Sequence, residues 1–194
     1  MYSIPTSVQI GEQSYPIRNN GDYRMVLDCF IALNDMELSQ QERLYACLII
    51  FYDGMEDISD WDVFSGNLEE AVMQMFKFFN CGSDIEKETK SVRLIDWEND
   101  SQLICSAINN VAGTEIRALP YLHWWTFMGY YLAIGESPLS TVVGIRNKIA
   151  TNQKLEKHER QFQHDNPQYF KMDYRTDADR EYDELVKQVW NKGD

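Results

Sequence analysis

Residues 119–135 of the chain, LPYLHWWTFMGYYLAIG, concentrate bulky apolar side chains around a single histidine, His123. Pro120 suits the first turn of a helix, where its missing N–H costs nothing, and Gly135 suits the residue that closes one. Apolar side chains would occupy most faces of this helix, and about fifteen residues is too short to cross a bilayer. The stretch therefore predicts a helix at the centre of a soluble core. Its expected core side chains are Tyr121, Leu122, Trp124, Trp125, Phe127, Met128, Tyr131 and Leu132.

The chain before this stretch predicts a β-hairpin followed by helices. Residues 7–10 and 14–17 are strand-like runs on either side of a glycine-containing turn, which is typical of a hairpin. A hairpin alone is marginal in water, so we expect it to dock on helices or pair with another chain. Three helices follow: Asp22 can cap the first, Ser39 and Glu42 form a capping box for the second, and the third spans 67–79 with Gly82 after it.

Helical periodicity continues on both sides of residues 119–135. One helix is expected over 96–112, where Gly113 ends it. Another begins at Ser137 and Pro138, as cap and first-turn residue, and runs to Pro167, becoming polar and exposed after residue 150. A last amphipathic helix is expected over 177–191.

The fold class that these patterns indicate is mainly α, a helical bundle around the central helix at about 119–135 with a short N-terminal β-hairpin. We expect four parts along the chain. Residues 1–82 hold the hairpin and three helices, 83–93 form a polar linker, 94–150 form a helical core region, and 151–194 form a polar helical extension.

Composition limits the classes of partner. The chain has 194 residues and a formal net charge of −13, so it lacks the basic excess with which proteins bind nucleic acid or anionic lipid. The four cysteines, Cys29, Cys47, Cys81 and Cys105, form no C-x-x-C pair, and no secretory signal opens the chain. We expect a reduced, soluble, cytoplasmic protein that binds neither nucleic acid nor membrane.

A search for catalytic chemistry finds no phosphate-binding, metalloprotease or nucleophile-elbow motif. His123 is expected to be a structural histidine bonded to a nearby carbonyl. Asp96 and Asp100 lie four residues apart near a helix start, where acidic side chains favour the helix dipole. The acidic segment around Trp61 lacks the glycine and the distal glutamate of a calcium loop. We therefore expect no enzyme, no cofactor, no metal, and no catalytic, cofactor-binding or metal-binding residue.

Interaction remains as the expected role. Trp, Tyr and Met are enriched at protein interfaces, and the chain is rich in all three. Since residues 119–135 are expected to be buried, residues 25–79 are the expected binding region. The candidate contact residues are Tyr45, Phe51, Tyr52 and Trp61, and the hairpin edge could pair copies of the chain.

The run LIDWENDSQLICSAINNVAGTEI at residues 94–116, followed by residues 119–150, resembles the bacteriophage protein family named for gene product fifteen. It is also similar to the second part of tail assembly chaperones from long-tailed phages. Three features carry the resemblance: the acidic D-W-E-x-D start at Asp96, Trp97, Glu98 and Asp100, the Y-L-H-W-W-x-F run from Tyr121 to Phe127, and G-I-R at Gly144, Ile145 and Arg146. The opening of the chain, a P-x-x-V-x-I-G strand leading to a Y-P-I strand, is similar to that of the same family.

The resemblance implies a non-enzymatic phage or prophage tail assembly chaperone. Such a protein binds the long helical tape measure protein, helps recruit tail tube subunits, works in the cytoplasm of the bacterial host and is not expected in the mature virion. It could also form a homo-oligomer. The acidic composition leaves an alternative, a DNA-mimicking inhibitor or other protein-binding adaptor of a host enzyme, whose binding would weaken steeply with salt.

Overall fold

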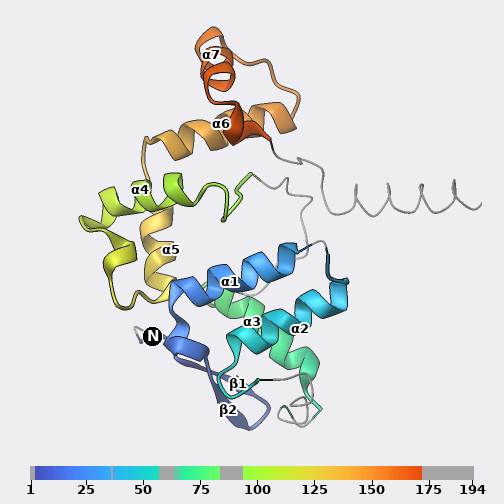
Figure 1. Ribbon diagram of the computed structural model, residues 1–194. Helices are drawn as coiled ribbons and strands as arrows, with labels where there is room; N and C mark the ends of the chain where they lie inside the picture. Colours follow the sequence, from blue (N-terminus) through green and yellow to red (C-terminus); the bar gives the residue numbers. More distant parts are fainter. Residues whose placement is uncertain (1–2, 36, 57–63, 65, 84–93, 172–194) are drawn as a thin grey trace, which may run out of the picture. The chain divides into compact units, whose positions relative to one another are not determined.

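The computed structural model describes residues 3–35, 37–56, 64, 66–83 and 94–171 (Figure 1). This part of the chain is mainly α-helical with one two-stranded antiparallel hairpin near the N-terminus, so the predicted fold class is confirmed. The elements in chain order are β1 (Ser7–Ile10), β2 (Gln13–Pro16), the 3-10 helix η1 (Arg18–Gly21), α1 (Tyr23–Asn34), α2 (Gln40–Phe51), α3 (Leu68–Phe79), α4 (Ser101–Ala112), η3 (Ile116–Ala118), α5 (Trp124–Leu132), α6 (Pro138–Ala150), α7 (Lys157–Asp165) and η4 (Pro167–Phe170).

The chain divides into two compact units. Unit 1 combines Met1–Glu86 with Ile104–Ile134, and unit 2 combines Lys87–Leu103 with Gly135–Asp194. The four-part division expected from sequence places its boundaries elsewhere, because residues 104–134 group with the hairpin and α1 to α3. Of the expected linker, residues 84–93 lie outside the described residues, as does the last helix expected over 177–191.

The hairpin of unit 1 forms where its sequence predicts. Gly11 takes a positive φ of 58° in the tight turn, a conformation that glycine adopts without steric cost. The second strand is Gln13–Pro16, one residue earlier than expected, and Ile17 instead makes an isolated bridge to Tyr52 after α2. The hairpin is thereby attached to the helices, as its marginal stability alone requires.

Local capping signals place the helices of unit 1. The Asp22 carboxylate accepts the Arg24 backbone N–H at 3.0 Å at the start of α1. Ser39 and Glu42 form a reciprocal capping box at the start of α2, with bonds of 3.3 and 2.8 Å. After α3, Gly82 has a φ of 87° and donates its N–H to the Lys77 carbonyl at 2.8 Å, which closes the helix.

The core of unit 1 is an aromatic cluster shared by several helices. Phe51 of α2 makes edge-on ring contacts with Phe78 and Phe79 of α3. Phe30 of α1 contacts both Phe79 and Trp124, and the Trp124 indole N–H donates to the Phe79 carbonyl at 2.9 Å. Such edge-on aromatic pairs add stability beyond the burial of their surface. The cluster therefore joins α1, α2, α3 and α5.

The expected helix over 119–135 is shorter than predicted, since α5 spans only Trp124–Leu132. Two contacts hold the residues before it in an extended conformation. Leu122 donates its N–H to the Asp22 carboxylate at 3.0 Å, and its carbonyl accepts the Tyr23 N–H at 2.9 Å. Pro120 therefore precedes the helix and does not lie in its first turn. None of the described helices has the length and apolar content that a membrane crossing needs.

The core predicted for this stretch is only partly observed. Among its side chains, Leu122, Trp124 and Phe127 are buried, while Trp125, Met128 and Tyr131 are half-buried. The prediction is wrong for Tyr121, whose hydroxyl reaches the Asn20 carbonyl from an exposed position, and for Leu132, which is 76% exposed. The physical reason is that Tyr121 precedes α5 and Leu132 is its last residue. The described contacts of α5 are with α1 and, through the Trp124 and Trp125 indoles, with the end of α3.

The helix expected over 96–112 begins later, at Ser101. The Asp96 carboxylate accepts the backbone N–H groups of Glu98 and Asn99 at 3.2 and 3.0 Å, which folds the preceding residues into a turn. Aspartate competes for backbone donors in this way and so favours turns and caps over helix interiors. The acidic residues thus precede α4.

Unit 2 contains a helix break that the sequence analysis did not predict. The helix expected from Ser137 to Pro167 ends at Ala150, where Asn152 has a φ of 54° and the Gln153 N–H bonds the Lys148 carbonyl at 2.7 Å. The chain then turns back as α7. The Ser137 cap and Pro138 at the first turn of α6 are confirmed.

Candidate functional site

Two of the four candidate contact residues are core residues. Phe51 and Tyr52 are 0% and 1% exposed, so the prediction that they lie on a binding surface is wrong. Phe51 belongs to the aromatic cluster, and the Tyr52 hydroxyl donates to the Ala71 carbonyl at 2.8 Å. Burial raises the pKa of Tyr52. Tyr45 is half-buried on α2, and Trp61 lies outside the described residues.

His123 has the structural role that was predicted. Its Nδ1 accepts the Trp125 backbone N–H at 3.0 Å and so caps α5, while Nε2 lies 3.0 Å from the Pro5 carbonyl. Because Nδ1 is the acceptor, the neutral ring carries its proton on Nε2 and donates it to Pro5. Burial lowers the pKa of His123, against smaller opposing effects of Pro5 and Asp22. Both ring nitrogens are engaged in holding the backbone.

The cysteines do not form a redox or metal site in the structure. All four are free thiols. Cys29 and Cys47 are buried between α1, α2 and α3, where the Cys47 thiol lies 3.6 Å from the Met75 sulfur. A hydrogen bond with the Cys47 thiol and burial both raise the pKa of Cys29, so this group stays protonated. Among the described residues, no group of three His, Cys, Asp or Glu side chains could hold a metal ion.

Arg146 and Asp100 meet inside unit 2, although they are 46 residues apart in the sequence. Two guanidinium nitrogens of Arg146 bind the two carboxylate oxygens of Asp100 at 2.5 and 2.8 Å. The same guanidinium donates to the Leu94 carbonyl at 2.9 Å and twice to the Tyr169 carbonyl, at 2.8 and 2.6 Å. The Asp100 carboxylate also accepts the Asp96 N–H at 2.9 Å. This network engages every guanidinium nitrogen and both carboxylate oxygens.

The ion pair changes the interpretation of the paired carboxylates. The carboxylates of Asp96 and Asp100, which lie four residues apart, are engaged with backbone N–H groups and, for Asp100, with Arg146. Sequence analysis noted the D-W-E-x-D and G-I-R motifs separately and missed their contact. Residue spacing carries no signal for it, because the two motifs meet only when α6 packs on the turn before α4.

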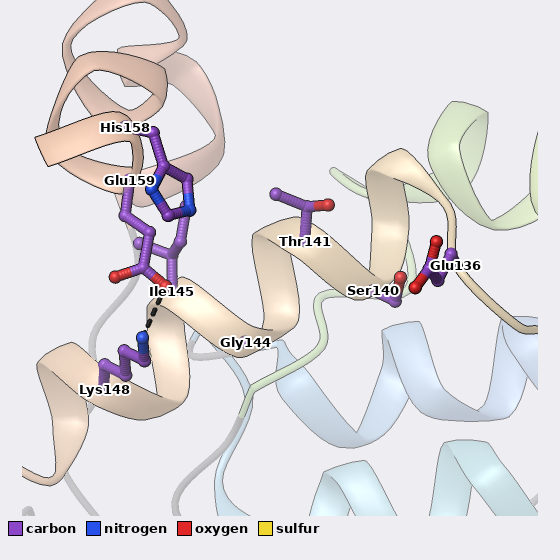
Figure 2. A pocket seen from close by; sticks show the side chains of 8 residues that line it. All are labelled: Glu136, Ser140, Thr141, Gly144, Ile145, Lys148, His158 and Glu159. Carbon is purple, nitrogen blue, oxygen red and sulfur yellow. Dashed lines mark hydrogen bonds and ion pairs between the residues drawn. The ribbon is translucent and has the colours of Figure 1, made fainter. Parts of the chain in front are cut away.

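A shallow groove of about 390 Å³ lies between α6 and α7 of unit 2 (Figure 2). Its lining residues are Glu136, Ser140, Thr141, Gly144, Ile145, Lys148, His158 and Glu159. Lys148 and Glu159 pair across it at 2.6 Å, and the bond to Lys148 lowers the pKa of Glu159. Lys148 and Glu159 therefore neutralise each other, and their bond links α7 to α6.

Exposed apolar side chains are the remaining candidate contacts. Those of large size in the described residues are Ile4, Ile31, Met73, Val111, Tyr121 and Leu132. All six lie in unit 1. On α2, Gln41, Tyr45 and Ile49 follow one another at four-residue spacing and so share a face, on which Tyr45 and Ile49 are half-buried. The geometry therefore offers apolar protein-contact positions, chiefly on helices, and no convergence of free polar groups among the described residues.

Comparison with known proteins identifies the family. The family model described as Bacteriophage Gp15 protein matches residues 2–172. The chain belongs to the Bacteriophage Gp15 protein family. No curated protein and no solved structure matches it. The Gp15 match includes all the described elements, and it contains both motifs that build the Arg146–Asp100 network.

Proposed function

We propose that this Gp15 family member is a tail assembly chaperone that binds the tape measure protein of its phage and helps recruit tail tube subunits. The observation that carries the proposal is the family match over residues 2–172, which makes the chain a phage protein. The specific role is what the resemblance of residues 94–150 to tail assembly chaperones implies. On this proposal the protein is not an enzyme, acts in the cytoplasm of the host and leaves before the virion is complete.

The chemistry of the described residues supports binding over catalysis. The buried charged groups are satisfied by structural partners: Asp22 by backbone N–H groups and Arg24, and Asp100 by Arg146. His123 caps a helix. Catalysis needs polar groups that converge on one accessible point, which these side chains do not do.

Unit 1 supplies positions to which an apolar helix could bind. A tape measure helix exposes apolar stripes until the tail tube encloses it, and such stripes dock on apolar residues spaced along a partner's helices. Tyr45 and Ile49 share one face of α2, and Met73 is exposed on α3. These contacts are few, so each copy would bind weakly, and several copies along one tape measure protein would hold it by multivalency.

The direct test is co-expression with the tape measure protein of the same phage. We expect the soluble fraction of the tape measure protein to rise and the two proteins to copurify. Tyr45→Ala combined with Ile49→Ala should reduce this capture, whereas Leu155→Ala, which removes a half-buried apolar side chain of unit 2, should preserve it. A tape measure protein that stays equally insoluble with and without this chain would refute the chaperone role. Equal effects of both variants would refute only the position on α2.

The net charge of −13 favours one alternative, an acidic inhibitor that mimics DNA. The salt dependence of binding distinguishes this alternative from the chaperone role. Binding through dense surface charge weakens steeply between low and moderate salt, because the charges are screened over about 10 Å at 0.1 M. Apolar helix docking changes little over the same range. Copurification should therefore be repeated across a salt series.

A further inference from the structure

We propose that the outer edge of β1 is an interface through which two copies of the chain pair, antiparallel around Val8. The inference does not depend on the chaperone role. It begins with the direction of the backbone groups. The Ile17 N–H donates to the Thr6 carbonyl at 2.9 Å, and the register places Val8 opposite Tyr15. Bonded pairs alternate along an antiparallel ladder, so the backbone groups of Ser7 and Gln9 point away from β2.

The outward backbone groups of β1 have no hydrogen-bond partner in the described part of the chain, although α3 packs against this strand. Ser7 and Gln9 are exposed, and no described residue bonds to their backbone N–H or C=O groups. By contrast, the far side of β2 is engaged after α2, where the Asp53 N–H donates to the Pro16 carbonyl at 3.1 Å. Proteins protect exposed edges with lysine, proline or a bulge, and the strand SVQI contains none of these.

Charge favours a second copy as the occupant. Residues 3–11, SIPTSVQIG, carry no charged side chain in a protein whose net charge is −13. Two copies repel each other through most of their surface charge, and this strand lets them approach along a neutral strip. A two-fold axis at Val8 would also match every outward group. Ser7 of each copy would face Gln9 of the other, and each such pair would exchange two backbone hydrogen bonds.

The structure also limits the length of the pairing. In this register Pro5 would face Gly11 of the other copy. Pro5 has no N–H, and the Gly11 N–H already donates to the Glu70 carboxylate at 2.9 Å. Pairing therefore stops after β1, and the association is short and reversible.

Amide exchange on the intact protein tests the edge directly. We expect sedimentation to show a monomer–dimer equilibrium. The Ser7 and Gln9 amides should exchange fast at low concentration and slow down as dimer forms. The Val8 amide, bonded within the hairpin, should be protected at every concentration. A chain that sediments as a monomer at all concentrations would overturn the proposal, as would a dimer in which the Ser7 and Gln9 amides stay unprotected.

Charge substitutions test the register. Ser7→Glu with Gln9→Glu places like charges opposite each other and should weaken dimerisation about tenfold. Ser7→Lys with Gln9→Glu places opposite charges across the axis and should restore it. Asn110→Glu, at an exposed position of α4, is the control for added charge and should leave the dissociation constant unchanged. Circular dichroism checks that each variant folds. If neither double substitution changed the dissociation constant of the dimer, the proposed interface would be refuted.

Discussion

The Arg146 guanidinium binds the Asp100 carboxylate through two hydrogen bonds, with both side chains 1% exposed. The pair holds three segments of unit 2 together, because Arg146 lies on α6, Asp100 precedes α4, and the Tyr169 carbonyl that Arg146 also binds lies in η4. Burying two charges costs several kcal/mol, which bonds of this quality can offset. The two motifs of the Gp15 resemblance thus have a shared structural role.

Removing one partner of this pair should be strongly destabilising. Asp100→Asn leaves the Arg146 charge buried and uncompensated, and we expect the free energy of unfolding of unit 2 to fall by about 3–5 kcal/mol. Arg146→Met combined with Asp100→Leu removes both charges and should recover much of this loss. Urea unfolding monitored by circular dichroism measures the change.

An exposed pair provides the control for this prediction. Glu115 and Arg117 are bonded at 2.8 Å, and their side chains are 43% and 46% exposed, compared with 1% for the buried pair. Surface pairs contribute little, so Glu115→Gln should leave the unfolding midpoint unchanged. Equal midpoints for Asp100→Asn and the wild type would show that the buried pair does not stabilise the protein.

The two adjacent tryptophans of α5 should differ in their contribution to stability. Trp124 is buried in the aromatic cluster, whereas Trp125 is half-buried and its ring lies against Gly82. Trp124→Ala should cost about 3–5 kcal/mol, and Trp125→Ala should cost less, because less surface and fewer contacts are lost. Leu132→Ala, at an exposed position, should have almost no effect. A larger loss for Trp125→Ala in thermal unfolding would contradict the observed packing.

Local signals in the sequence predicted the hairpin, the caps and the fold class. The Ser39–Glu42 capping box, the Asp22 cap and the Ser137–Pro138 helix start need only neighbouring residues, and all are observed. The central position of residues 119–135 could not be predicted in the same way. The burial of these residues depends on which faces of α5 are covered by other helices, and amino-acid composition alone does not determine which faces are covered.

Contacts between residues far apart in the chain could not be predicted from the sequence either. Phe51 and Tyr52 are aromatic residues at the end of α2, and aromatic content fits a binding surface as well as a core. Only their packing against α3 decides the matter, through the rings of Phe78 and Phe79 and the Ala71 carbonyl. The return of α7 onto α6 likewise brings together Lys148 and Glu159, which are 11 residues apart.

Alanine substitutions at Gly21 and Gly54 distinguish the cost of a steric clash from the cost of backbone strain. Both have positive φ, 77° and 82°. A Cβ at Gly21 would lie 2.7 Å from the Phe78 ring and 3.0 Å from His123 Nε2, whereas one at Gly54 would meet nothing within 4 Å. Gly54→Ala should cost about 1–2 kcal/mol from the left-handed conformation alone. Gly21→Ala should cost clearly more, and equal losses in urea unfolding would exclude a steric role for this contact.

Protonation of His123 should make the stability of the protein depend on pH. Burial holds the pKa of His123 below the ordinary value of 6.5, and Nδ1 must stay unprotonated to accept the Trp125 N–H. The unfolded chain therefore binds more protons than the folded one as pH falls below about 6.5. The stabilisation is fully present above this pH and is lost as pH falls through the folded pKa. His123→Asn is the control, because asparagine can cap a helix and does not titrate. The difference in unfolding free energy between wild type and this variant, measured by urea unfolding between pH 5 and 8, should shift against the wild type on acidification. A difference that stays constant over this range would show that His123 has the same pKa in both states.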